Sequence, residues 1–150
     1  MIIDESLEPT KGRSKFGVKL WVLAELVTGY IMHLNVYNER QHDPTLAGIL
    51  QGSYVVNMLL KCTGLLRKGY HIINDSFFTS INLARELIDK DTFLTGTLCA
   101  KRPMPNSIRN LVLGENQCVY VRQSPILFCV NKERQDCKPV QVLSTSCTAI

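Results

Sequence analysis

Residues 69–98 read GYHIINDSFFTSINLARELIDKDTFLTGTL, and they carry the clearest secondary-structure signals in the chain. Within them, His71–Asp75 is a short apolar run between turn residues that closes on a carboxylate, which predicts a central strand. Thr79 or Ser80 can cap the helix that the spacing of the following apolar residues predicts. The β-branched and apolar run Thr92–Leu98 then predicts a second strand. A strand, a helix and a strand in this order indicate an α/β fold.

Toward the N-terminus, the pattern predicts three strands and a helix. Phe16–Leu26 alternates and then becomes fully apolar, and Tyr30–Tyr37 resumes the alternation after a glycine turn. These two segments therefore predict an antiparallel hairpin. Apolar residues recur at helical spacing between Ser53 and Leu65, which predicts a helix. Met1–Ile3 is short and apolar, and it predicts a first strand that ends at Asp4.

Toward the C-terminus, Lys101–Asn110 is predicted to be a proline-containing loop with basic side chains. Three strands of an antiparallel meander are expected after it, at Cys118–Arg122, Ile126–Val130 and Val140–Thr145. The order β-β-β-α-β-α-β followed by appended antiparallel strands is typical of a ribonuclease-H-like mixed sheet. We therefore expect an α/β fold in which residues 1–150 form one such domain.

Length and composition limit the class of protein. A chain of 150 residues that is 45% hydrophobic and 20% charged suits one globular domain. No apolar run reaches the roughly 20 residues that cross a bilayer, so we expect no membrane partner. Residues 1–13 lack the apolar core of a secretory signal, and the six cysteines form no C-x-x-C pair. We therefore expect free thiols in a reducing compartment.

Positive charge is concentrated in the last third of the chain. The net charge is +4, and residues 101–150 hold seven basic and three acidic residues. Basic side chains bind the phosphate backbone of nucleic acids. A small net positive charge is equally common on domains in which the charge serves only to keep the protein in solution. Lys101, Arg102 and Arg109 are the candidates for DNA contact, and a solvated charged loop is the alternative.

Two carboxylates are the candidates for chemistry. Asp75 is predicted to end a buried strand, where open α/β sheets collect their functional groups, although an aspartate there can also cap a helix or form a turn. Asp4 is predicted to end a neighbouring strand, and a pair of carboxylates favours a hard divalent cation. His71 lies on the same face of its strand as Asp75, either as a partner in the chemistry or as a structural histidine.

Several blocks of the sequence resemble the catalytic domain of piggyBac transposases, and the similarity extends from Ile2 to about Thr145. The blocks are IDES at 3–6, KFGVKLWV at 15–22, TGY at 28–30 and GYHIINDSFFTS at 69–80. The resemblance implies a ribonuclease-H-like domain whose active relatives use three aspartates to hold two Mg²⁺ ions that cut and rejoin DNA strands. It also implies a nuclear location and DNA as a partner.

The resemblance assigns Asp4 and Asp75 to the first two catalytic aspartates, each expected to ligate metal. The counterpart of the third would lie after Ile150, so we expect a domain truncated before its last helix. This implies a domesticated or decayed DNA transposase domain that is catalytically inactive, needs no cofactor and can retain DNA binding. One alternative is a metal-dependent transposase or nuclease in which Glu86, Glu115 or a partner chain supplies the third acid. The other is a non-enzymatic interaction module that self-associates through an exposed sheet edge.

Overall fold

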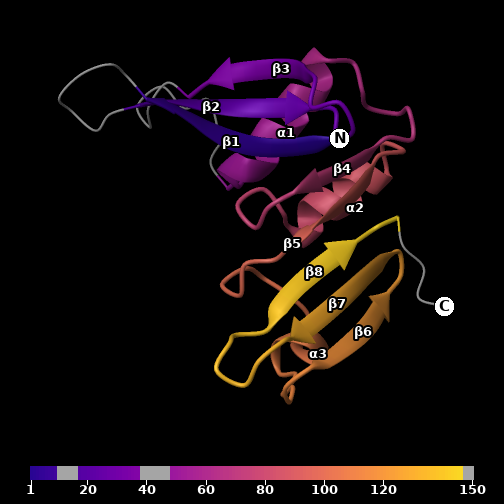
Figure 1. Cartoon of the computed structure of the whole chain (residues 1–150). Helices are drawn as coiled ribbons and strands as arrows, with labels where there is room; N and C mark the ends of the chain where they lie inside the picture. The colour runs from indigo at the N-terminus through magenta and orange to yellow at the C-terminus, as the bar shows by residue number, and fades with distance from the viewer. Residues whose placement is uncertain (10–16, 38–47, 147–150) are drawn as a thin grey trace. The chain divides into compact units, whose positions relative to one another are not determined.

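The computed structural model describes residues 1–9, 17–37 and 48–146 (Figure 1). By its internal contacts the chain divides into two compact units, Met1–Leu65 and Leu66–Ile150. Each unit has its own strands and helices. Among the described residues, no helix has the length and apolar character needed to cross a membrane. A single ribonuclease-H-like domain over residues 1–150 stays a prediction.

The described part of the first unit is an antiparallel meander with one helix (Figure 1). Its elements are β1 (Ile2–Pro9), β2 (Gly17–Ala24), β3 (Ile31–Val36) and α1 (Gln51–Cys62), and the strand order is β3-β2-β1. Leu20 pairs with Val36 and Val22 pairs with Leu34, which confirms the predicted hairpin. The predicted helix is also confirmed, since α1 covers most of the expected range.

The core of the first unit forms from the side chains that alternate along its strands and from the buried side of its helix. Side chains alternate between the faces of a strand, so Trp21 and Leu23 reach the same face and are both buried, as is Ile3 of β1. The helix α1 contacts β3 and buries one side of its surface. The buried apolar residues of that side are Val55, Val56, Leu59 and Leu60.

The first strand is longer than predicted. The sequence predicts a strand that ends at Asp4, but β1 continues in register with β2 until Pro9 pairs with Gly17. Asp4 therefore lies inside the strand, opposite Val22. Backbone hydrogen bonds do not depend on side-chain polarity, and an exposed strand tolerates a polar sequence.

The second unit combines parallel and antiparallel strands. Its elements are β4 (His71–Asn74), α2 (Ile81–Ile88), β5 (Phe93–Thr97), α3 (Asn106–Arg109), β6 (Gln117–Gln123), β7 (Ile126–Lys132) and β8 (Val140–Ser144). The strand order is β4-β5-β8-β7-β6. β4 and β5 are parallel, whereas β5, β8, β7 and β6 pair antiparallel. The predicted mixed α/β class, the strand-helix-strand unit and the meander are confirmed.

The helix α2 begins at a defined cap. Ser80 Oγ accepts a hydrogen bond from the Leu83 N–H at 3.1 Å, so Ser80 and not Thr79 caps the helix. Leu83, Ala84 and Leu87 form its buried side. Thr79 is also fully buried, and its hydroxyl has partners in β4 and in the turn after it.

Candidate functional site

Asp75 lies directly after β4, at the strand end where the sequence predicts it. We call residues 75–79, which join β4 to α2, the acidic turn. Asp75 Oδ1 accepts a hydrogen bond from the Phe77 N–H at 2.9 Å, so the carboxylate forms an Asx turn with its own backbone. The side chain is exposed. One carboxylate oxygen is thus fixed, and the other is available to a cation or a hydrogen-bond donor.

Thr79 and Gly96 fix the start of the acidic turn. Thr79 Oγ1 lies 2.6 Å from Asn74 Oδ1 and 2.7 Å from the Asp75 carbonyl oxygen, and the Thr79 N–H donates to that carbonyl at 3.1 Å. Gly96 pairs with Asn74, and a Cβ at position 96 would come within 2.6 Å of the Asn74 carbonyl oxygen. The Asn74 Nδ2 is buried and has no hydrogen-bond partner among the described residues, which is unusual for a buried donor.

Arg102 connects the predicted DNA-contact residues to the acidic turn. Its guanidinium Nη2 donates a hydrogen bond to the Phe77 carbonyl oxygen at 2.5 Å, and Arg109 Nη2 donates to the Arg102 carbonyl oxygen at 3.4 Å. Lys101 and Arg109 are exposed, whereas Arg102 is half-buried. Lys101–Asn110, which we call the basic segment, therefore lies against the turn that carries Asp75. Arg102 has a structural contact that the sequence does not predict.

The basic segment also contains a helix that the sequence pattern does not predict. The prediction for Lys101–Asn110 is a loop, but α3 occupies its second half and begins directly after Pro105. A helix of one turn is too short to show an apolar period, so the sequence gives no signal for it. Met104 and Ile108 are buried and anchor the segment.

Asp4 belongs to the first unit and is exposed on β1. Its Oδ1 accepts a hydrogen bond from the Glu5 N–H at 2.8 Å. The side chain lines an open cavity of about 290 Å³ together with other residues of β1, β2 and β3, among them the apolar Val22 and Ile31. Asp4 thus resembles Asp75 in having one oxygen bound by backbone and one oxygen open.

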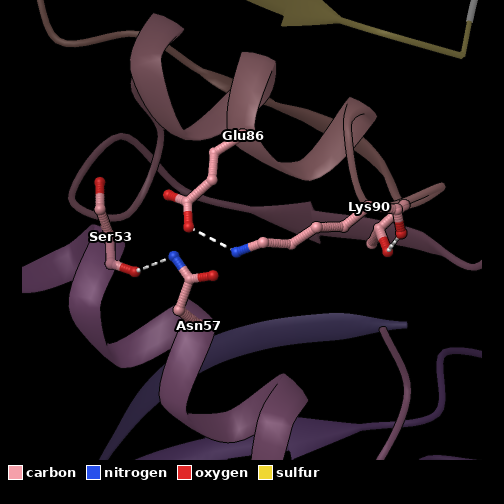
Figure 2. A network of polar contacts seen from close by, with 5 residues as sticks. Ser53, Asn57, Glu86 and Lys90 are labelled. Atoms are coloured by element: carbon pink, nitrogen blue, oxygen red, sulfur yellow. Dashed lines mark hydrogen bonds and ion pairs between the residues drawn. The ribbon is translucent and has the colours of Figure 1, made fainter. Parts of the chain in front are cut away.

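The two aspartates suit a hard cation by their chemistry. Mg²⁺ prefers carboxylate oxygen, and each aspartate offers one. Within residues 1–9, 17–37 and 48–146, no group of three or more His, Cys, Asp and Glu side chains is placed to hold a metal ion. Glu86, a candidate third acid, is ion-paired with Lys90 at 2.5 Å (Figure 2), and Glu115 is exposed in the turn before β6.

Figure 2 also shows a helical contact in α1. Asn57 Nδ2 donates a hydrogen bond to the Ser53 carbonyl oxygen at 3.1 Å, one turn earlier in the helix. The Glu86–Lys90 pair has the same spacing, and it joins the last turn of α2 to a residue just after the helix ends. The first contact joins a side chain to the backbone and the second joins two side chains, and both are local contacts across one helical turn.

His71 is part of a hydroxyl network. Its Nε2 lies 2.8 Å from Thr95 Oγ1, which in turn lies 2.7 Å from Ser144 Oγ. Burial lowers the pKa of His71 from its ordinary value, so the neutral ring is favoured. Of the two roles that the sequence left open, these contacts favour the structural one.

Comparison with known proteins identifies the family. A protein-family model described as Transposase IS4 matches residues 7–150. The chain belongs to this transposase family. The cryo-EM structure of the piggyBac transposase synaptic complex with hairpin DNA has the same fold, with a TM-score of 0.80 and 22% sequence identity. The predicted piggyBac resemblance is confirmed at the level of family and fold.

The transposase domain is shorter than the structure that it resembles. The similarity covers 99% of this chain and 33% of the piggyBac transposase chain. This chain therefore spans a third of that protein's length. No curated protein matches it.

Proposed function

We propose that this transposase-family domain binds DNA through a basic surface formed by Lys101, Arg102 and Arg109. The observation that carries the proposal is the hydrogen bond from Arg102 to the Phe77 carbonyl oxygen, because it joins the basic segment to the acidic turn. Lysine and arginine side chains position a nucleic acid by its phosphates. The related solved structure is a transposase complex with hairpin DNA, which supports DNA as the ligand class. A protein that acts on DNA is expected in the nucleus.

We also propose that the domain is a domesticated or decayed transposase that does not cut DNA by itself. In two-metal catalysis, the ions activate the attacking oxygen and stabilise the leaving oxygen of the phosphodiester. Asp4 and Asp75 are the residues that would hold Mg²⁺, each through its open carboxylate oxygen. The piggyBac resemblance assigns no third aspartate among these residues. Glu86 is already engaged by Lys90.

Fluorescence anisotropy with a labelled DNA duplex tests the binding proposal. Affinity should fall as salt rises, because each phosphate that the protein neutralises releases condensed counterions. Lys101→Gln and Arg109→Gln should each weaken binding. Each substitution should also reduce the slope of log K against log salt by about 0.9, the value for one phosphate that is no longer neutralised.

Lys68→Gln is the matched control, since Lys68 is an exposed lysine of the same unit outside the proposed surface. Its affinity and salt slope should equal those of the unsubstituted protein. Absence of binding at low salt contradicts the proposal, and so does an equal loss of affinity in all three variants.

A further inference from the structure

Two cysteines on neighbouring strands bring their sulfur atoms close together. Cys118 lies in β6 and Cys129 in β7, and they are diagonal neighbours, because Cys118 pairs with Asn131 and Cys129 pairs with Tyr120. Side chains two positions apart on a strand share a face, so both sulfurs lie on the same side of the sheet. The Sγ atoms are 3.4 Å apart, and both thiols are free.

The two thiols differ in exposure. Cys118 is exposed, whereas Cys129 is partly buried and has Tyr120 and Val142 as its cross-strand neighbours. Burial and the hydrogen bond with Cys118 raise the pKa of Cys129 to about 11. The thiolate is the reactive form of cysteine. Because Cys118 is exposed and the raised pKa of Cys129 keeps that thiol protonated, Cys118 is the thiol that reacts first with a reagent from solution.

We propose that Cys118 and Cys129 form a reversible redox pair that closes to a disulfide across β6 and β7 on reaction with a small-molecule disulfide such as oxidised glutathione. The Cys118 thiolate attacks one sulfur of the oxidant and releases one glutathione thiolate. Cys129 then gives its proton to solvent and attacks the Cys118 sulfur, which releases the second glutathione thiolate. Two protein thiols become one disulfide, and the oxidant is reduced to two thiols.

The geometry favours a disulfide over a metal site. A disulfide bond is about 2.05 Å long, so sulfurs at 3.4 Å have to approach each other by little more than an ångström. A structural zinc needs four ligands, and no group of three or more suitable side chains occurs among the described residues. A disulfide needs only two sulfurs, but diagonal positions on neighbouring strands lie farther apart than directly opposed ones. The backbones of β6 and β7 therefore have to shift toward each other as the bond forms.

Formation of the Cys118–Cys129 disulfide would change the edge of the sheet in the second unit. β6 is the last strand in the order β4-β5-β8-β7-β6, so it has a strand neighbour on one side in that unit. A covalent link to β7 holds this strand in register and restricts the unfolded chain. The oxidised protein should therefore unfold at a higher temperature than the reduced protein.

Mass spectrometry after incubation in glutathione buffers of increasing oxidised fraction tests the pair. Arg122 lies between the two cysteines, so trypsin separates them unless a disulfide joins their peptides. We expect a linked peptide pair that lacks two hydrogen atoms and that dithiothreitol separates again. Cys118→Ser and Cys129→Ser should each abolish the link, whereas Cys62→Ser, which removes another exposed thiol, should leave it.

The order of the two steps gives a second test. Because Cys129 must lose its proton to attack, mixed disulfide at Cys118 should accumulate near neutral pH and convert faster as the pH rises. A chain that stays unlinked in the most oxidising buffer contradicts the proposal. Mixed disulfide that forms on Cys129, or that stays on Cys118 at every pH, contradicts it as well.

A third test uses the unsubstituted protein, because a serine variant that misfolds would also lose the disulfide. The reagent is an arsenical that bridges two thiols. Phenylarsine oxide reacts stably only with two neighbouring thiols. We expect one arsenic bound per chain and protection of both Cys118 and Cys129 from alkylation. Failure to bind, or protection of a different pair of cysteines, overturns the assignment.

Discussion

Glu25 stabilises the turn that joins β2 to β3. Its carboxylate accepts hydrogen bonds from the Val27 N–H at 2.9 Å and from the Thr28 N–H and hydroxyl, both at 2.6 Å. The Thr28 hydroxyl bond and the two backbone bonds lower the pKa of Glu25 to about 2. Gly29 supplies the left-handed backbone of the turn, with φ of 70°. The ionised carboxylate is therefore a structural part of the hairpin.

We expect the hairpin to lose stability in acid. The folded pKa of Glu25 lies below its ordinary value of 4.5, so its contribution is complete above pH 4.5 and is lost as the pH falls toward about 2. Glu25→Gln preserves the shape but cannot ionise, so it should remove this part of the pH dependence and lower the melting temperature at neutral pH. An NMR titration of the Glu25 carboxyl group measures the pKa directly.

The control for Glu25 is a glutamate in a different turn. Glu115→Gln removes an exposed carboxylate from the turn before β6 and should leave the melting temperature at neutral pH unchanged. A titration midpoint for Glu25 near 4.5 would show that the turn does not depend on the charge.

Single residues also show the limit of what a sequence reveals about a site. Asp75 was predictable because a strand signal ends at it, and the structure places it there. The contact of Arg102 with the Phe77 carbonyl joins residues 25 positions apart, and no local pattern reports such a contact. The Cys118–Cys129 pair depends in the same way on the register of β6 with β7.

Among the elements, β5 approaches the acidic turn so closely that position 96 requires glycine. A Cβ there would collide with the Thr79 hydroxyl and lie 2.5 Å from Asn74 Oδ1. Gly96→Ala should therefore destabilise the fold by about 1–3 kcal/mol, the usual cost of overpacking a core. It should also displace Asp75, since Thr79 and Asn74 fix the start of its turn.

Urea unfolding of Gly96→Ala and Gly114→Ala measures this effect with a matched control. The nearest neighbour of a Cβ at position 114 would be the Gln117 side chain at 3.4 Å, an ordinary contact. The second variant should keep or slightly raise the unfolding midpoint of the original protein, because alanine restricts the unfolded chain. Equal midpoints for the two variants would refute the close approach at Gly96.

The elements that were predicted correctly have one buried side, so their apolar residues repeat at a regular spacing in the sequence. The hairpin of β2 and β3 alternates, and α1 repeats its apolar residues every third or fourth position, because each has one buried side. β1 was predicted too short because residues 4–6 are polar, whereas backbone pairing with β2 continues to Pro9. Side-chain polarity reports burial and not backbone pairing, so it underestimates an exposed strand.

For the whole molecule, the strength with which the two aspartates bind a divalent metal ion distinguishes an inactive domain from a nuclease. Asp4 and Asp75 each have one oxygen bound by a backbone N–H and one open oxygen. Mg²⁺ loses its water reluctantly and usually takes one or two carboxylates together with substrate phosphates. Isothermal titration of Mg²⁺ or Mn²⁺ into the DNA-free protein should therefore show only weak binding.

A plasmid assay completes this prediction. We expect no metal-dependent nicking of supercoiled DNA, and Asp75→Asn should behave like the original protein, because the proposed inactive domain has no cutting step to remove. Nicking that disappears in Asp75→Asn, together with tight metal binding, would contradict this proposal and establish a cutting enzyme. Glu86→Gln and Glu115→Gln would then show whether one of these side chains acts as the third acid. Nicking that survives both substitutions but depends on protein concentration would instead indicate an acid from a partner chain.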